Sequence, residues 1–359
     1  MKILLNGATG GTNFGDFLFA KIFHDTVSGL VGEENVFWYE SRYCLSEFYK
    51  RHLNYSSRKF KLKEMDALVC ISGGYFCGDD RKLRHYVIRY FRYFHLCFRC
   101  ILRKIPIAII GVEVSKPKIK IMEWIERAIL RRADIVVVRN IDSLNQLENY
   151  GVKNGICTVD TAHVITPQLF DNCKISEEIS SLTGKKIFFH VQPSMQSVAW
   201  KLIPTVKQFV NEHPEYSIVV GMDQYLENDS CLQKIADAFC GINVVINHYD
   251  DPVCLCKVLN AMDLIITPKL HVGIVGAILS KSVISFSSHT EKIARFYHQL
   301  GEEERSLSMM DFSEKKALEM LEKYHDVPIN VDQNMVEKAQ KNLECLGTFI
   351  RKHSKKDEA

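Results

Sequence analysis

The feature that most constrains the fold is a repeated alternation between short apolar runs and longer amphipathic segments. Six runs in the first half have the length and composition of strands, at 3–5, 35–39, 67–71, 107–110, 134–138 and 157–159. Helical periodicity fills most of the intervals, at 16–27, 81–103, 120–131 and 141–149. Apolar strands separated by amphipathic helices predict a parallel sheet that helices cover on both faces.

The same pattern restarts in the second half. Strand runs lie at 186–190, 217–221, 243–247, 264–266 and 283–286, and helices are expected at 200–212, 226–239, 253–262, 270–279 and 291–300. Because 168–185 is polar, we expect α/β domains at 1–167 and 168–312, followed by helices and a tail at 313–359 that could pack on either domain. Two doubly wound, Rossmann-like domains of this kind would face a cleft at the carboxyl ends of their strands.

Composition excludes several classes of protein. The 359 residues are 47% hydrophobic and 25% charged, which argues against a disordered chain. The net charge of +3 is too balanced to predict nucleic-acid binding. The first apolar run ends at Asn6-Gly7, and no apolar stretch reaches the roughly 18 residues that span a bilayer, so we expect a cytoplasmic protein. The twelve scattered cysteines lack zinc-ribbon spacing, so we expect no metal site.

Two small-residue segments follow predicted strands. The loop from Asn6 to Asp16 is rich in glycine and precedes a helix, a setting that suits a phosphate or carboxylate. Asn13 and Asp16 could contact such a ligand, although helix capping by Asp16 is the simpler interpretation. Ser72-Gly73-Gly74 follows the run 67–71 and could form either a tight turn or a close approach to a ligand.

Arg139 ends the apolar run 134–138, so we expect its side chain to point into the cleft. Its guanidinium matches a carboxylate or phosphate in two-point contact. Ser143, on the next helix, could cap that helix or contact the same ligand. A surface ion pair for Arg139 is an equally good interpretation at this point.

The sharpest feature is Thr267-Pro268-Lys269-Leu270-His271, between the strand 264–266 and a helix of small and apolar residues. Such a helix is expected to be buried, which would hold Lys269 and His271 at its N-terminus. A cation there opposes the helix dipole, and an anionic ligand would relieve the repulsion. Imidazole can donate or accept a proton near neutral pH, although a lone histidine is more often structural.

Together these segments resemble the polysaccharide pyruvyl transferase family, from Asn13 to about residue 300. The shared blocks are Asn13-Phe14-Gly15-Asp16, Ser72-Gly73-Gly74, Arg139 with Ser143, Leu147, Gly151-Val152 and Asp160, the run from Asp263 to His271, Ala277, Val283-Ile284-Ser285, and Lys292. The chain departs from the family at Lys269, where arginine is usual, and at His289, where tyrosine is common. Lysine keeps the charge of arginine but loses its two-pronged donor geometry.

The resemblance implies a GT-B-like fold and transfer of a pyruvyl group from phosphoenolpyruvate to two hydroxyls of one sugar, which forms a ketal and releases phosphate. It implies no metal and no cofactor besides the phosphoenolpyruvate donor. His271 is the expected general acid and base. The expected donor-binding residues are Arg139, Ser143, Lys269, Leu270 and Lys292. The expected acceptor or loop contacts are Asn13, Gly15, Asp16, Gly73, Gly74 and Asp160.

A basic amphipathic helix is predicted over 81–104. Its cations recur every three or four residues, at Arg81, His85, Arg89, Arg92, His95, Arg99 and Arg103. The apolar face is expected at Val87, Phe91, Phe94, Phe98 and Ile101. The simpler interpretation is an ordinary helix packed on the core. The basic face could also contact the inner face of an anionic membrane, where a lipid-linked saccharide would be presented.

Two other functions remain open at this point. A nucleotide-sugar glycosyltransferase of the same architecture would need an acidic residue for the base or ribose, and Asp223 and Asp250-Asp251 are available. A saccharide-binding relative that has lost catalysis is the second alternative. Choice of donor separates the first from a pyruvyl transferase, and a Lys269→Arg variant tests the second.

Overall fold

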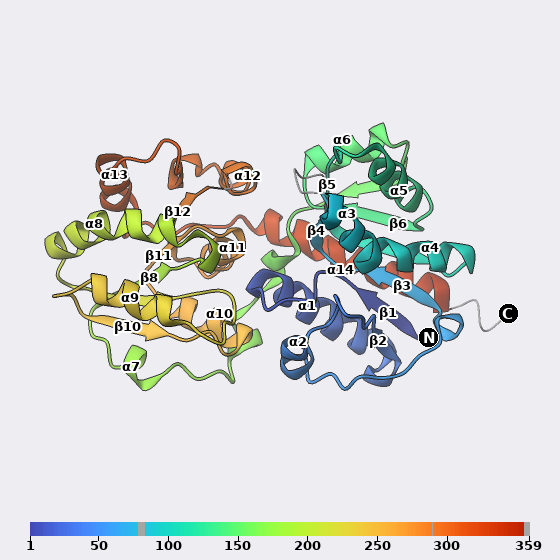
Figure 1. The fold of residues 1–359 in the computed structure, drawn as a ribbon, viewed down its shortest axis with the longest axis horizontal. Helices are drawn as coiled ribbons and strands as arrows, with labels where there is room; N and C mark the ends of the chain where they lie inside the picture. The colour runs from blue at the N-terminus through green and yellow to red at the C-terminus, as the bar shows by residue number, and fades with distance from the viewer. Residues whose placement is uncertain (78–82, 289, 355–359) are drawn as a thin grey trace. The chain divides into compact units, whose positions relative to one another are not determined.

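The computed structural model describes residues 1–77, 83–288 and 290–354, so Arg81 and His289 lie outside the described residues. The chain divides into two compact units (Figure 1). The first contains residues 1–12, 16–164 and 334–359, and the second contains 13–15 and 165–333. The short segment 13–15 therefore belongs to the second unit, although it lies near the start of the chain.

The first unit is built on a seven-stranded sheet in the order β2-β1-β3-β5-β6-β7, with β4 also paired to β5. All of its strand pairs are parallel. The strands are β1 (Ile3–Asn6), β2 (Val36–Trp38), β3 (Ala67–Cys70), β4 (Gly73–Phe76), β5 (Ile107–Val114), β6 (Ile135–Val138) and β7 (Gly155–Cys157). The helices are α1 (Phe14–Val31), α2 (Glu47–His52), α3 (Leu83–Arg89), α4 (His95–Leu102), α5 (Lys120–Leu130), α6 (Ile141–Asn149) and α14 (Gln333–Ser354).

The second unit is built on a six-stranded parallel sheet in the order β10-β9-β8-β11-β12-β13. The strands are β8 (Lys185–His190), β9 (Tyr216–Gly221), β10 (Val244–Asn247), β11 (Leu264–Thr267), β12 (Ser282–Ser287) and β13 (Ser306–Ser308). The helices are α7 (Glu177–Ser180), α8 (Gln196–Glu212), α9 (Ser230–Ala238), α10 (Pro252–Asn260), α11 (Leu270–Ile278), α12 (Thr290–Leu300) and α13 (Glu314–Tyr324).

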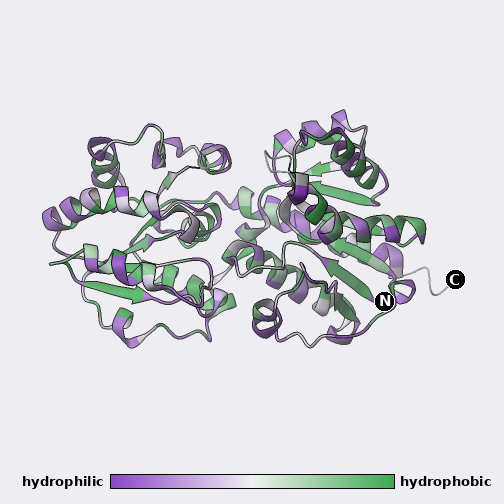
Figure 2. Cartoon of the chain, viewed as in Figure 1, coloured by the Kyte–Doolittle hydropathy of each residue, from purple (hydrophilic) through white to green (hydrophobic). Residues whose placement is uncertain are grey.

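The central strands explain why the sheets are parallel and covered on both faces. Every residue of β1, β3, β5, β9, β11 and β12 is buried. Such strands are mostly apolar, whereas the helices mix hydrophobic and hydrophilic residues (Figure 2). The prediction of two parallel α/β domains is confirmed. β4 and β13 were not predicted, because β4 begins with two glycines and β13 contains a single apolar residue, Leu307.

The two C-terminal helices belong to different units. α13 lies in the second unit, and α14 packs in the first. Asn342 on α14 is fully buried, donates to the Val159 carbonyl oxygen at 3.1 Å, and accepts from the Thr158 hydroxyl at 2.9 Å. These bonds secure α14 beside the loop that follows β7.

The predicted helix 81–104 is interrupted, and its expected faces are wrong in part: Phe94 is buried, and Phe98 and Ile101 pack on the core as expected. A π-helical turn (Tyr90–Phe94) separates α3 from α4, and its wider winding changes the register of the side chains. Val87 and Phe91, expected in the core, are each about half exposed. Arg89, expected on the basic face, turns inward to pair with the buried Glu126. Buried residues that were not predicted for that face are Tyr86, Tyr93, Leu96, Cys97 and Cys100.

Among the residues that the structure describes, no helix is both long and apolar enough to cross a membrane.

Candidate functional site

In the second unit, polar side chains gather where neighbouring strands end. His190 is the last residue of β8, Thr267 is the last of β11, and Asp223 follows β9 by two residues. His190 Nδ1 lies 2.7 Å from Thr267 Oγ1, and His190 Nε2 lies 3.3 Å from Asp223 Oδ1. All three residues are buried. Parallel strands bring their carboxyl ends to one edge of a sheet, which is where ligands of doubly wound folds bind.

Lys269 joins this group from the loop before α11. Its Nζ lies 3.4 Å from Asp223 Oδ2, and about a quarter of its side chain remains exposed. Burial alone would raise the pKa of the Asp223 carboxyl, but the Lys269 ammonium and the His190 imidazole outweigh burial and lower the pKa to about 2. Asp223 is therefore ionised at neutral pH, and it holds Lys269 beside the strand ends.

The helix that follows, α11, is buried as predicted from Val272 to Ala277. Lys269 is its N-cap residue, and Leu270 and His271 form its first turn; both are half-buried. The Lys269 side chain makes no capping bond to the helix. The first backbone N–H groups of a helix favour an anion, so the N-terminus of α11 and the Lys269 ammonium favour the same kind of ligand.

The segments that contain Gly15 and His271 meet in this unit. A Cβ atom added at Gly15 would lie 1.8 Å from Nδ1 of His271, so only glycine allows the backbone to pack against the imidazole. The segment is secured by the Phe14 N–H, which donates to the Asp223 carbonyl oxygen at 2.9 Å, and by a β-bridge between Asn13 and Gln224. The N-terminal motif thus borders the Lys269 and His271 motif.

Two further predicted residues lie on helix N-termini. Lys292 is exposed in the first turn of α12. Asp16 lies inside the first turn of α1, which begins at Phe14, and it belongs to the first unit. The interpretation of Asp16 as the helix cap is therefore wrong, because the residue lies two positions inside the helix.

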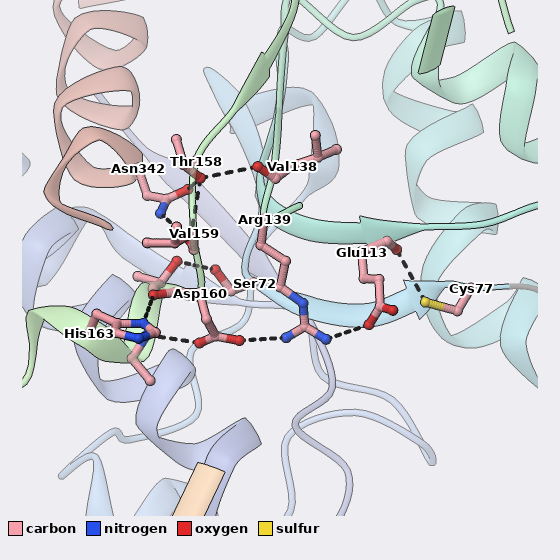
Figure 3. Close-up of polar contacts among 12 residues, drawn as sticks. Ser72, Cys77, Glu113, Val138, Arg139, Thr158, Val159, Asp160, His163 and Asn342 are labelled. Carbon is pink, nitrogen blue, oxygen red and sulfur yellow. Dashed lines mark hydrogen bonds and ion pairs between the residues drawn. The ribbon is translucent and has the colours of Figure 1, made fainter. Parts of the chain in front are cut away.

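In the first unit, Arg139 is enclosed between two carboxylates (Figure 3). Its Nη1 donates to Asp160 at 2.7 Å, and its Nη2 donates to Glu113 at 2.5 Å. All three side chains are buried, so the interpretation of Arg139 as a surface residue is wrong. Burial would lower the pKa of Arg139, but Asp160 and Glu113 outweigh it and raise the pKa. The three groups sum to a negative charge, so a donor anion would have to compete with both carboxylates for Arg139.

The other predicted residues of this unit form hydrogen bonds at the carboxyl ends of its strands. The Val114 N–H donates to the Ser143 hydroxyl at 2.9 Å, and the Ser143 N–H donates to Asn140 Oδ1 at 2.8 Å. Ser72 Oγ lies 2.7 Å from Thr161 Oγ1. Gly73 and Gly74 begin strand β4 and do not form a tight turn, so that interpretation is wrong.

Several residues of these clusters were not predicted as site residues. His190 and Glu113 lie within apolar strand runs, and their signal was the same as that of Arg139, a polar side chain at or near the carboxyl end of a buried strand. Asp223 was considered only for a nucleotide. Gly111, with φ +69°, would place a Cβ atom 2.2 Å from Ser72 Oγ, a constraint that the sequence does not reveal.

One group of described side chains has the composition of a metal site. His213, Glu322 and His325 have ligand atoms within 4.8 Å of one another. His213 Nε2 already lies 3.0 Å from the Glu322 carboxylate, and Tyr216 donates its hydroxyl to Asp326 at 2.8 Å beside His325. These contacts link α8, β9 and α13, which accounts for the cluster without an ion.

The fold is that of the UDP-GlcNAc 2-epimerases, whose two-domain arrangement is GT-B. The enzyme from Neisseria meningitidis, solved with UDP-GlcNAc, matches with a TM-score of 0.65 at 12% identity, over 96% of this chain and 99% of that one. The enzyme from Methanocaldococcus jannaschii gives 0.62 at 11%, over 96% and 99%. The enzyme from Rickettsia bellii gives 0.60 at 10%, over 98% and 96%. Identities this low establish the fold and not the activity.

The family is established by sequence. The family model "Polysaccharide pyruvyl transferase" matches residues 13–290, which is more than half of the chain. The chain therefore belongs to the polysaccharide pyruvyl transferase family and is a transferase. The matched range includes both clusters described above. A comparison with curated proteins found no match.

Proposed function

We propose that this transferase moves a pyruvyl group from phosphoenolpyruvate to two hydroxyls of one sugar of a polysaccharide or a lipid-linked saccharide, which forms a pyruvate ketal and releases phosphate. The observation that carries the proposal is the cluster at the strand ends of the second unit. There a partly exposed ammonium, a helix N-terminus and an imidazole lie within one short segment, from Lys269 to His271.

The donor carries a carboxylate and a phosphate, and both need cationic or N–H partners. We assign one of these anions to Lys269 and to the backbone N–H groups that open α11, beginning with Leu270. Lys292 is the proposed second cation, since it is exposed and follows β12 in the same unit. Arg139 and Ser143 remain proposed donor contacts. For Arg139 this role requires that it exchange a carboxylate partner for the donor.

His271 is the proposed general acid and base. A proton adds to the methylene carbon of the donor, which becomes a methyl group, and positive charge develops at the neighbouring carbon. One sugar hydroxyl bonds to that carbon, the carbon–oxygen bond to phosphate breaks, and the second hydroxyl completes the ketal. The two hydroxyls lose one proton each. One of these protons replaces the proton that His271 delivered to carbon, and the other leaves on phosphate.

Asp223 and His190 are proposed as positioning residues. Asp223 holds the Lys269 ammonium, and His190 bridges Asp223 and Thr267 beneath it. Asn13, Gly15, Asp16, Gly73, Gly74 and Asp160 remain proposed acceptor or loop contacts. For Gly15 the supporting observation is its close approach to His271.

The test is phosphate release from phosphoenolpyruvate with a panel of purified saccharides, run in parallel in water and in deuterium oxide. A product with an added pyruvate ketal, and with one deuterium in its methyl group when made in deuterium oxide, is the expected result. The deuterium arises because the third methyl hydrogen comes from solvent. Phosphate release without a ketal product, or a methyl group free of deuterium, would overturn the mechanism.

Nucleotide-sugar chemistry is the second candidate, because the structural neighbours named above are UDP-GlcNAc 2-epimerases. Two of the three acidic residues available for it, Asp223 and Asp251, are already engaged. Asp223 binds Lys269, and Asp251 caps α10 by accepting from the Val253 N–H at 2.7 Å. Turnover of a UDP-sugar, with none of phosphoenolpyruvate, would favour this candidate. Activity that arises only in a Lys269→Arg variant would instead indicate a relative that has lost catalysis.

A further inference from the structure

An apolar groove opens on the outer surface of the first unit, between α3, the π-helical turn, α4 and α5. Its volume is about 440 Å³. Its walls are almost wholly apolar or aromatic: Tyr86, Val87, Tyr90, Phe91, Phe98, Ile121, Met122, Trp124 and Ile125. The Phe98 and Trp124 rings stack with centroids 6.4 Å apart, which joins α4 to α5 at this point.

The groove is part of a concentration of exposed hydrophobic side chains. Six of the twelve large hydrophobic residues exposed in the described part of the chain lie between Val87 and Trp124. Within the groove, Ile121 is 63% exposed and Trp124 is 64% exposed. A concentration of exposed apolar side chains is typical of a surface that binds an apolar partner. None of these residues belongs to either polar cluster described above.

The same segment is strongly cationic. Residues 83–132 contain twelve Lys and Arg but only three Glu, although the whole chain carries only +3. All three glutamates have a basic partner: Glu113 pairs with Arg139, Glu123 with Lys116 and Glu126 with Arg89. Nine cations of the segment are exposed, namely Arg84, Arg103, Lys104, Lys116, Lys118, Lys120, Arg127, Arg131 and Arg132.

Three of these cations lie next to the groove by helical spacing. Arg84 precedes Val87 by one turn, Lys120 precedes Trp124 by one turn, and Arg127 follows Trp124 by one turn. An apolar surface bordered by cations matches the interface of an anionic bilayer, where hydrocarbon lies beneath a layer of negative headgroups. A second copy of this chain is a poorer match, because a symmetric contact would bring two such cationic segments together.

We propose that this groove surface docks on an anionic lipid bilayer, with Phe91, Ile121 and Trp124 entering the interface and the surrounding cations contacting the headgroups. This surface differs from the basic helix face that the sequence suggested as a membrane contact. Arg89 of that face pairs with the buried Glu126, and apolar side chains are exposed in its place. Docking of this kind needs neither donor nor acceptor, so it stands apart from the proposed reaction.

The test is co-sedimentation of the full chain with two kinds of vesicle, phosphatidylcholine alone and an equimolar mixture of phosphatidylcholine and phosphatidylglycerol. The expected result is binding to the mixed vesicles that weakens with added salt, and little binding to phosphatidylcholine alone. Phe91→Ser with Trp124→Ser should reduce binding on the order of tenfold or more, because both side chains would enter the interface. Arg84→Gln with Lys120→Gln should reduce binding only to the mixed vesicles.

Matched variants on the second unit provide the controls. Trp200→Ser with Val327→Ser removes two exposed apolar side chains, and Lys174→Gln with Lys201→Gln removes two exposed cations. Both control pairs should bind like the wild type, and all variants should keep the thermal unfolding midpoint of their controls. Equal binding to both vesicle types, or equal losses in the control pairs, would overturn the proposal. A self-association that Phe91→Ser with Trp124→Ser abolishes, with no vesicle binding, would overturn it in favour of a second copy.

Discussion

The two polar clusters lie at equivalent places in two similar sheets, yet they differ in how their charges are balanced. In the first unit, Arg139 is buried and bound by Glu113 and Asp160. In the second, Asp223 is the one carboxylate that pairs with Lys269 among the described residues, and part of the Lys269 side chain stays exposed beside a helix N-terminus. A cation at the end of a buried strand can therefore serve mainly the fold or be available to a ligand. Arg139, with two carboxylate partners, is the first case, and Lys269, with one, is the second.

The largest expected difference between the clusters is in stability. Arg139→Gln removes the cation that two buried carboxylates share, so we expect the free energy of unfolding to fall by about 3–5 kcal/mol. Lys269→Gln leaves Asp223 with His190 and should cost only about 1 kcal/mol, while it raises the KM for phosphoenolpyruvate. Urea unfolding and steady-state kinetics on the two variants measure both effects. Equal losses of stability would remove the contrast between the clusters.

A smaller effect, on turnover, is expected from Gly15→Ala. The added methyl group would displace the His271 imidazole, and a misplacement of about 1 Å can lower a rate on the order of a hundredfold. Gly29→Ala, in the same helix, is the matched control because nothing lies within 4 Å of its added Cβ. That control should keep full turnover and gain up to about 1 kcal/mol of stability. Normal turnover of Gly15→Ala would show that the imidazole need not stay in place.

The smallest expected effect concerns pH. The pKa of Asp223 is about 2 in the folded chain and about 3.9 for an unfolded carboxyl, so its ionised form stabilises the fold above pH 4. This contribution, about 2 kcal/mol, should be lost as the pH falls from about 4 to about 2. The difference in unfolding free energy between the wild type and Asp223→Asn should therefore shrink over that range. A difference that is independent of pH would contradict the lowered pKa.

The sequence was sufficient to predict the fold because the strands are nearly continuous apolar runs, as in β5 and β9, and because Gly and polar residues mark the loops. The pairing of Lys269 and His271 at the N-terminus of α11 was visible for the same reason, since adjacent residues must lie together. Contacts across the sheet were not visible. Asp223 lies 46 positions before Lys269 in sequence, yet their side chains meet.

The region from α3 to α4, which follows β4, is where the prediction from sequence was least accurate. Arg89 and Val87 were assigned to faces by a regular helical period, and the π-helical turn changes that period. Arg89 also pairs with the buried Glu126 on α5, a contact between elements that are far apart in sequence. No local pattern contains this ion pair. Packing between helices therefore decided which side chains became the exposed groove.

The most direct test of the proposed active site compares His271→Ala with His298→Ala, which removes an exposed imidazole from α12 in the same unit. We expect His271→Ala to slow phosphate release from phosphoenolpyruvate by about a hundredfold to ten-thousandfold, while it still binds the donor and unfolds at the wild-type temperature. His298→Ala should behave like the wild type. Near-normal phosphate release by a folded His271→Ala would contradict the account.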